Sequence, residues 1–338
     1  MSEKRYFHFT KAGLFYGMDR LEDAISALLE GGYIWLNYYN PEKEELMALV
    51  DKLGIHPLSV EDCMDEKQVP KIEHFHDNTF IIFNAFQYAD KTIYIDEINL
   101  FIGRNFLITV SGHNSGERKP LSEIEKIISN DPGNTYLGPA ELLHRVIDYL
   151  VDQKFNALES VEDELEAAED QILDSPASFD PADLMRIRKS LQVLRKSLFH
   201  EREILVKICR LDCPFITESV IFHYRDIYDH LVKFFELVES CREIVTSLME
   251  LYTSLQNNLM TRSANETSTS MRRLTLIATV FMPLTLIASI GGMSEWSMIT
   301  GPSNWKIYYP LFILGMAVIA IINYVIIRRI ERRGRVLK

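Results

Sequence analysis

One face of an apolar stretch near the C-terminus carries small, polar or methionine side chains. They recur at steps of three or four residues, at Met271, Thr275, Ala278, Met282, Thr285, Ser289 and Gly292, and we call these seven residues the stripe. Such steps place side chains on one face of a helix. Small residues in a membrane helix usually mediate close packing, which is the interpretation that the stripe alone favours. The same face could instead line a narrow pore without charges.

A second set of side chains with possible chemistry lies earlier in the chain. Asp226, Asp229 and His230 follow one another at i, i+3 and i+4, so they share one face of a predicted helix. Carboxylate oxygens and an imidazole are ligands for divalent cations. The more common outcome of this spacing is a solvated helix face, and both interpretations stay open at this point.

Two segments near the C-terminus are long and apolar enough to cross a membrane. Residues 274–294 and 307–327 each comprise 21 residues without a formal charge. At 1.5 Å per residue, a helix of that length spans a hydrocarbon core of about 30 Å. Because the loop 295–306 is short, we predict a hairpin of two transmembrane helices, TM1 and TM2, whose outer flanks face the same compartment.

Charge is distributed unevenly along the chain. The protein carries a net charge of −12, yet residues 271–338 hold nine basic and two acidic side chains, so the first 270 residues carry −19. This acidic body argues against nucleic-acid binding. Arginines flank both spans on their outer sides, which places these flanks in the cytoplasm. The N-terminal MSEKRYFHFTKAG lacks an apolar signal-peptide core, so we expect a multi-pass protein of the cell membrane with both termini cytoplasmic.

The part before the spans contains two differently patterned regions. Residues 1–135 hold short β-branched and aromatic runs, YIWLNYY, FIIFNAFQY, INLFIG and NFLITV, and helical stretches such as PEKEELMALVDKLG. We predict an α+β cytoplasmic domain there, an α/β sandwich whose mixed sheet is flanked by helices. Residues 136–213 are predicted to be helical, with apolar series before and after a break at SPASFDP: Leu143, Val146, Leu150, Phe155, Leu158, Val161 and Leu165, then Leu184, Ile187, Leu191, Leu194 and Leu198.

A long stretch without helix breakers follows. Neither Gly nor Pro occurs between Pro214 and Pro283. We predict a stalk helix over 214–273 that continues into TM1 at 274–294, and a basic cytoplasmic tail at 328–338. The alternative is a break at TRSANETSTS, residues 261–270. Two spans cannot enclose a water-filled path, so transport across the lipid bilayer would require a homo-oligomer.

Several of these segments resemble one known family. The run LTLIATVFMPLTLIASIGGM, with its short loop, second span and basic tail, resembles the membrane hairpin of the CorA family of divalent metal-ion transporters. GIHPLSVEDCMDEKQVPKIEHF, LVDQKFNALESVEDELEAAEDQIL and YRDIYDHL are similar to that family's cytoplasmic signatures. The resemblance implies a homopentameric funnel in which TM1 of each copy lines the pore. The pore residues that it implies are the stripe together with Leu274, Met293 and Ser294.

The resemblance also identifies a departure and a regulatory site. In the family, Gly-Met-Asn follows TM1 and receives hydrated Mg²⁺ at the outer mouth, whereas this chain has Gly292, Met293 and Ser294. Because a Ser hydroxyl reaches less far than an Asn amide, we expect weaker selectivity for Mg²⁺. The resemblance further implies that Asp226, within YRDIYDH, binds regulatory Mg²⁺ between subunits, with Asp90 as its partner and Asp229 and His230 beside it.

Three functions are compatible with these observations. The leading one is a passive channel for Mg²⁺, with Co²⁺ or Ni²⁺ as competitors, gated by cytoplasmic divalent cation and driven by the membrane potential at about 4.6 kcal/mol per 100 mV for two charges. The others are Zn²⁺ transport coupled to a proton gradient and a non-conducting membrane sensor of metals. A passive channel needs no ATP site, and no GxxxxGK[ST] motif occurs. We expect no enzyme, because His56-Pro57 opens a helix in the resembling family and the neighbouring Glu61 and Asp62 more often serve surface pairing.

Overall fold

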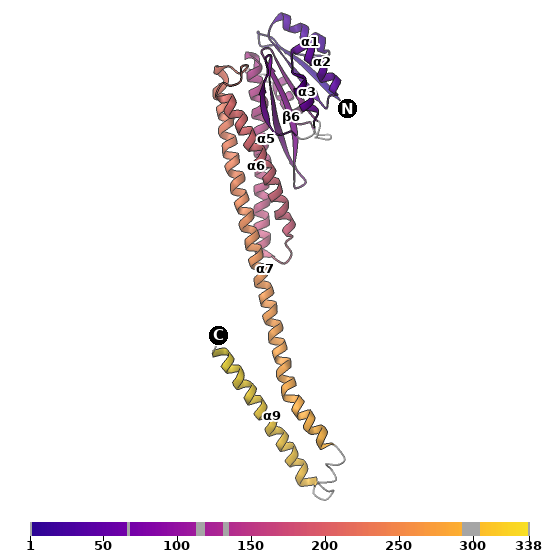
Figure 1. The fold of residues 1–338 in the computed structure, drawn as a ribbon, viewed down its shortest axis with the longest axis vertical. Coiled ribbons are helices and arrows are strands. Elements are labelled where there is room, and N and C mark those ends of the chain that lie inside the picture. The colour runs from indigo at the N-terminus through magenta and orange to yellow at the C-terminus, as the bar shows by residue number, and fades with distance from the viewer. Residues whose placement is uncertain (1, 66–67, 113–118, 131–134, 293–304, 337–338) are drawn as a thin grey trace. The chain divides into compact units, whose positions relative to one another are not determined.

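The computed structural model describes residues 2–65, 68–112, 119–130, 135–292 and 305–336 (Figure 1). The chain forms two compact units, Met1–Tyr252 and Thr253–Lys338. The first unit contains a sheet and the helices that cover it. The second contains two long apolar helical segments. The boundaries predicted at 135 and 213 both fall within the first unit.

A seven-stranded mixed sheet is the framework of the first unit. β3 and β7 pair in parallel and every other neighbouring pair of strands is antiparallel. The runs YIWLNYY, FIIFNAFQY, INLFIG and NFLITV lie in β3, β5, β6 and β7, so the predicted mixed sheet is confirmed. In spatial order the strands are β2 (Phe15–Met18), β1 (Glu3–Phe9), β3 (Tyr33–Tyr39), β7 (Phe106–Ser111), β6 (Thr92–Gly103), β5 (Asn78–Ala89) and β4 (Lys71–His74).

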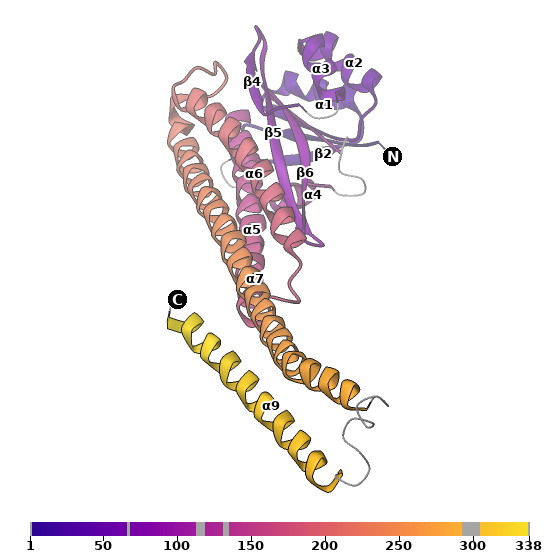
Figure 2. The same ribbon diagram turned by 60° about the horizontal axis from the view of Figure 1, so that its bottom comes forward.

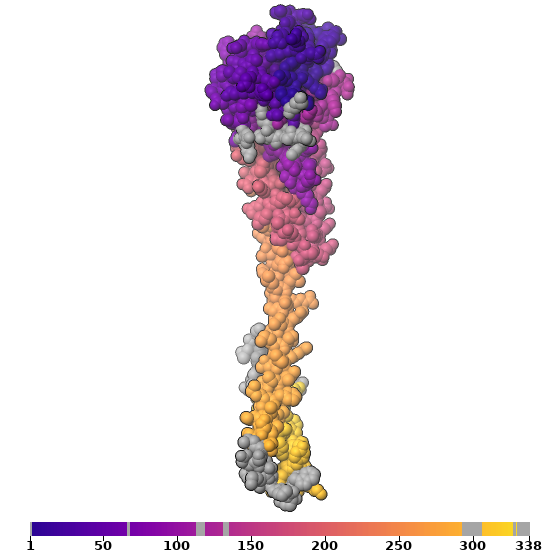
Figure 3. All heavy atoms as spheres, turned by 90° about the vertical axis from the view of Figure 1, so that its right-hand side faces the viewer, coloured from indigo at the N-terminus to yellow at the C-terminus, as the bar shows by residue number. Residues whose placement is uncertain are grey.

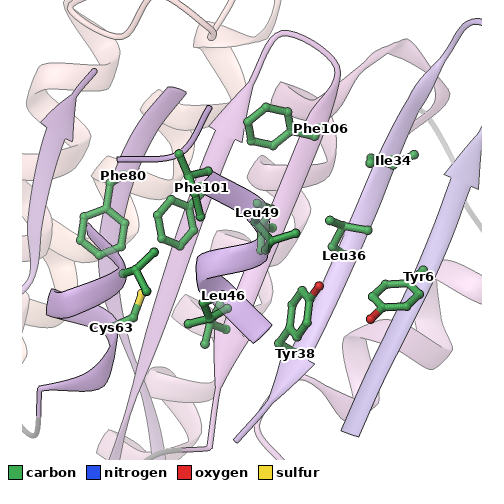
Figure 4. Packing of buried hydrophobic residues seen from close by; sticks show 14 of the residues in the cluster. Tyr6, Ile34, Leu36, Tyr38, Leu46, Leu49, Cys63, Phe80, Phe101 and Phe106 are labelled. Atoms are coloured by element: carbon green, nitrogen blue, oxygen red, sulfur yellow. The ribbon is translucent and has the colours of Figure 1, made fainter. Parts of the chain in front are cut away.

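Short helices cover one face of this sheet. They are α1 (Leu21–Ala27), the 3₁₀ turn η1 (Leu28–Glu30), α2 (Lys43–Leu53) and α3 (Pro57–Met64). Figure 4 shows Leu46 and Leu49 of α2 above the sheet, with Cys63 of α3 beside Phe80 and Phe101, and all five side chains are buried. His56 caps α3 because its Nδ1 accepts the N–H of Leu58 at 3.2 Å, so the helix begins at His56-Pro57 as predicted.

Two long helices cover the other face (Figure 2). They are α5 (Pro139–Asp174) and α6 (Pro181–Cys209), and α4 (Ser122–Asn130) and the turn η2 (Thr135–Leu137) precede them. Asp180 caps α6 by accepting the N–H of Ala182 at 2.9 Å, so the predicted break is confirmed. The predicted apolar series are buried except at Phe155, which is 43% exposed. Phe155 stacks on Phe234 instead, and Lys154 takes the buried position next to it.

The sequence patterns did not predict the N-terminal strands β1 and β2 or the short strand β4. β1 begins with three charged residues, Glu3, Lys4 and Arg5, which are not typical of a strand. Only the last four residues of β1 are buried. Its place depends on partners that are distant in sequence. Phe9, for example, stacks in parallel on Tyr33 of β3 with ring centroids 4.6 Å apart.

The predicted stalk is one uninterrupted helix. After the turn η3 (Glu218–Val220), α7 runs from Ile221 to Gly291, so it begins later than the predicted position 214. Residues 261–270 are helical, and the alternative of a break at TRSANETSTS is therefore wrong. Every side chain from 261 to 270 is exposed in the single chain. A helix that is exposed all round gains little from its own chain beyond contacts such as Arg262 with Glu266, 3.7 Å apart.

The second unit ends with α9 (Trp305–Val336), which contains the predicted TM2 and continues past residue 327 into the basic tail. Within the described residues, two helices are long and apolar enough to cross a membrane. They are α7, which contains the predicted first span as far as Gly291, and α9, which contains the predicted second span.

Candidate functional site

Part of the stripe lines an open hollow on α7. The hollow has a volume of about 500 Å³, and Ala278, Met282, Thr285 and Ser289 all contribute to it. Phe281 and Leu286, which do not belong to the stripe, also line it. The lined face is therefore wider than the stripe and apolar at its edges. Elsewhere along this face, Met271 and Leu274 are 64% and 68% exposed.

The opposite face of α7 approaches α9 closely at Gly291. The backbone of Gly291 lies so close to α9 that a Cβ there would be 2.7 Å from Cζ of Phe312. Gly291 follows Met282 by nine residues, which at 100° per residue is a half-turn away. In Figure 3 the yellow atoms of α9 lie beside the orange atoms at the end of α7. The half-buried residues of this segment of α7 all lie on Gly291's side: Leu276, Val280, Pro283, Leu284, Ile287 and Gly291.

This arrangement bears on the two interpretations of the stripe. Phe312 of the chain's own second span lies against the face opposite the stripe, and Met316 and Asn323 of that span are also half-buried. The stripe therefore does not serve packing between the two spans of one chain. It stays available for contacts with other copies or for lining a path between them.

The stripe offers oxygen atoms without charge. Thr275 donates its hydroxyl to the carbonyl of Met271, and Thr285 to that of Phe281, both at 2.9 Å. Each hydroxyl keeps a lone pair, so it can accept from water outside the helix. Neutral acceptors suit a cation that retains its hydration shell, as Mg²⁺ does because it dehydrates reluctantly.

The predicted outer mouth is described only at its first residue. Gly292 directly follows the last residue of α7, and its N–H donates to the carbonyl of Ala288 at 3.0 Å. Met293 and Ser294 lie outside the described residues. Their predicted role stays a prediction.

The predicted regulatory residues on α7 do not all act on the same neighbouring helix. Asp226 is exposed, and its charge acts on His144 and Asp148 of α5, as the charge of His230 acts on Asp148. Asp229 instead acts on Cys209, where α6 ends. The spacing in the sequence placed all three residues on one face, but only Asp226 and His230 face α5.

Asp90 lies far from Asp226 within one chain. It sits at the tip of the β5–β6 hairpin with φ 50°, and Arg186 binds the carbonyl of the next residue, Lys91, together with the carboxylate of Glu164. Glu164 and His144 are 20 residues apart on α5, a rise of about 30 Å. A shared metal site of Asp90 and Asp226 would therefore have to form between two copies.

The carboxylates on α5 and α7 form an acidic surface. Burial raises the pKa of Asp148, and the charges of Asp152 and Asp226 raise it further. A bound cation would relieve this repulsion, and carboxylate oxygens are suitable ligands for Mg²⁺. Among the described residues, no three His, Cys, Asp or Glu side chains are arranged to hold a metal ion. A metal site on this surface would therefore need ligands from a second copy.

His144 gives this region a dependence on pH. Burial, followed by the charges of His223 and Arg145, lowers the pKa of His144 to about 4, and its ring centroid lies 4.8 Å from that of His223. Between pH 6.5 and 4 the folded state thus binds fewer protons at this site than the unfolded state, so its stability falls on acidification. Between pH 7 and pH 5, we expect the free energy of unfolding to fall more for the wild type than for His144→Phe. The expected difference between the two decreases is about 1–2 kcal/mol. Chemical denaturation of both proteins at pH 7 and pH 5 measures these decreases. Equal decreases for the variant and the wild type would contradict the prediction.

Comparisons with known proteins agree with the predicted architecture. The family described as "CorA-like Mg2+ transporter protein" matches residues 30–329. The cobalt/magnesium transport protein CorA of Thermotoga maritima is 32% identical over 300 residues, which cover 87% of this chain and 82% of that protein. Its counterpart in Methanocaldococcus jannaschii is 28% identical, with coverage of 86% and 89%. The complete structure of the CorA magnesium transporter from M. jannaschii superposes with a TM-score of 0.70 and 26% identity, over 96% of this chain and 97% of that one.

Proposed function

We propose, because this chain belongs to the CorA-like Mg²⁺ transporter family, that its copies assemble into a homopentameric channel that admits Mg²⁺ to the cell. The protein is a divalent metal-ion transporter and not an enzyme, and its homologues are named for cobalt and magnesium. The observation that carries the proposal is the orientation of α7, whose stripe lies on the face opposite to α9. In this assembly both termini are cytoplasmic, and the stripes of five copies surround one path.

The lining of this path favours a hydrated cation. Its polar atoms are neutral hydroxyls and its other members are Met, Ala and apolar side chains. Nothing in such a lining would replace the water of Mg²⁺, so the ion passes with its hydration shell. The membrane potential drives a divalent cation inward with about 4.6 kcal/mol per 100 mV, and no coupled ion is needed. Ser294 replaces the Asn of the mouth, and we propose that it weakens selection among hydrated divalent cations.

Uptake of several metals into proteoliposomes at a fixed inside-negative potential tests this function. We expect Mg²⁺, Co²⁺ and Ni²⁺ to enter and to compete with one another, because all three have similar hydrated ions. Entry of Zn²⁺ alone would contradict the proposal, as would the absence of any uptake, which the non-conducting sensor predicts. Empty liposomes are the control.

We further propose that divalent cation bound at Asp226 closes the channel. The first 270 residues of each copy carry −19, and Asp226 adds to the repulsion around Asp148. A cation bound between copies would screen these charges and hold the stalks together, so its loss would let the acidic units separate.

Limited proteolysis across Mg²⁺ concentrations tests this gating role. We expect Asp226→Ala to shift protection of the first unit to higher Mg²⁺, because the variant loses a carboxylate ligand. Glu236→Ala, an exposed carboxylate further along the same helix, is the matched control and should behave as the wild type. Identical protection curves for all three proteins would assign Asp226 to a solvated helix face.

A further inference from the structure

A second hollow in the first unit lies away from the stripe and from the acidic surface. It has a volume of about 550 Å³ and is lined by residues of α6, of the strands β5 and β6 and of the segment before β4. This volume falls within the range of roughly 300–1,000 Å³ typical of small-molecule sites. Its lining combines buried polar groups, two opposite charges and apolar side chains.

The floor of the hollow is a fixed polar pair. Asn84 and Ser197 are only 7% and 4% exposed, and the Asn84 side-chain amide donates to the Ser197 hydroxyl at 2.7 Å. Both residues also bind one oxygen of the fully buried Glu201, through the Asn84 N–H at 3.0 Å and the Ser197 hydroxyl at 3.2 Å. Lys154 lies 3.3 Å from the same oxygen. Hydrogen bonds within the protein therefore hold the floor in place before any ligand binds.

One wall of the hollow is formed by the carboxylate of Glu97. Glu97 lies directly across from Asn84 in the β5–β6 pairing. Its oxygens accept the N–H of Gln68 at 2.8 Å and the amide of Asn99 at 3.1 Å. Burial raises the pKa of Glu97, as do the charges of Asp62 and Asp65. No basic side chain in the described part of the chain forms an ion pair with Glu97, so its charge is open to a cationic ligand.

The remaining lining determines which kind of cation would fit. Ile95 and Val193 make part of the wall apolar, and among the described residues that line it Glu97 is the only carboxylate. A metal ion would need more oxygen ligands and no apolar wall, whereas an organic ammonium with an apolar body matches both features. Lys196, exposed on α6 and also part of the lining, adds a positive charge that would attract an anionic group on the same molecule.

We propose that this hollow binds a small zwitterion with an apolar body, of the amino-acid class. Its ammonium lies at Glu97, its carboxylate at Lys196 and its apolar body against Ile95 and Val193. The bound molecule would connect α6 with the sheet, and it would stabilise the first unit because it binds the folded form. This site is independent of ion conduction.

Calorimetric titration of the full-length protein in detergent, with EDTA present to remove divalent cations, tests the site with three probes. They are leucine, isoamylamine, which lacks the carboxylate, and 4-methylpentanoate, which lacks the ammonium. We expect leucine to bind most tightly, isoamylamine more weakly and 4-methylpentanoate most weakly, because the ammonium meets the more deeply buried charge. The absence of saturable leucine binding by the wild type would overturn the proposal.

Single variants then test which charge of the ligand Glu97 binds and which Lys196 binds. Glu97→Gln keeps the shape of the side chain and should weaken leucine and isoamylamine roughly tenfold or more. Lys196→Met should weaken leucine to the level of isoamylamine and leave isoamylamine unchanged. Lys189→Met, an exposed lysine two turns earlier on α6, is the matched control and should leave all three affinities unchanged. Equal affinities of the Lys196→Met and Lys189→Met proteins for leucine would overturn the proposal even if Glu97→Gln failed to fold.

Discussion

Replacing Lys154 with methionine lowers the free energy of unfolding of the first unit by about 3–5 kcal/mol. The side chains of Lys154 and Glu201 are 2% and 0% exposed, and their charged atoms are 3.3 Å apart. Burial lowers the pKa of Lys154 and raises that of Glu201, and each is opposed by the charge of the other residue. Without Lys154, the carboxylate of Glu201 stays buried with no cation beside it. The structure must then either keep that charge uncompensated or protonate it.

The contacts of Lys154 explain why the effect is large. Its ammonium lies 4.2 Å from the ring centroid of Phe83 and 5.1 Å from that of Phe86, and it donates to the backbone carbonyl of Asn84. It therefore connects α5 with β5, while Glu201 connects α6 with the same strand. Methionine preserves most of the volume but none of these polar contacts.

Denaturant titration of the single and double variants separates the ion pair from the packing. We expect Lys154→Met/Glu201→Leu to recover at least half of the loss, because apolar residues of similar volume often replace a buried ion pair at little cost. Arg188→Met, an exposed basic residue on α6, is the control and should change stability by less than about 0.5 kcal/mol. A Lys154→Met protein as stable as this control would contradict the structural assignment of the pair.

The second large effect concerns the stripe. Ser289→Phe should reduce Mg²⁺ flux to the rate of protein-free liposomes, because Ser289 lines the hollow on α7 and five aromatic rings would fill a narrow path. Ile290→Phe is the matched control. It adds the same ring one residue later, about 100° around the helix, where the wild type already has a large exposed side chain.

Flux in liposomes containing equal amounts of pentameric protein measures the difference. We expect the Ile290→Phe protein to conduct Mg²⁺ at a rate close to that of the wild type. The Ser289→Phe protein should give no flux above that of protein-free liposomes. Equal rates for the two variants would show that the stripe does not line the path. Size measurement on both variants checks that the proposed pentamer forms, so that loss of flux reports the pore and not the assembly.

The sequence predicts the elements whose pattern is local. The β-branched runs of β3, β5, β6 and β7 give their strands, and Asp180 followed by Pro181 gives the start of α6. The absence of Gly and Pro between 214 and 283 gives one stalk helix, although it begins only at Ile221. The charge-free lengths predict both membrane helices. Each of these signals depends on residues close in sequence, where propensity and periodicity act.

The rest depends on contacts between distant residues. A spacing of i, i+3 and i+4 placed Asp226 and Asp229 together, but α5 and α6 approach α7 from different sides and divide them. Lys154 is buried although lysine is usually exposed, because Glu201 lies 47 residues later on a neighbouring helix. No pattern of residues close in sequence predicts this ion pair. The orientation of the stripe likewise required the contact between Gly291 and Phe312.

The most direct test of the passive channel is Mg²⁺ influx into proteoliposomes at a clamped inside-negative potential without a pH gradient. A Mg²⁺-sensitive dye inside the vesicles reports entry while the potential is varied and a protonophore is added. The account predicts influx that grows with the potential and is unaffected by the protonophore, because the driving force is the charge of the ion alone. Influx that appears only when a proton gradient is imposed would contradict it.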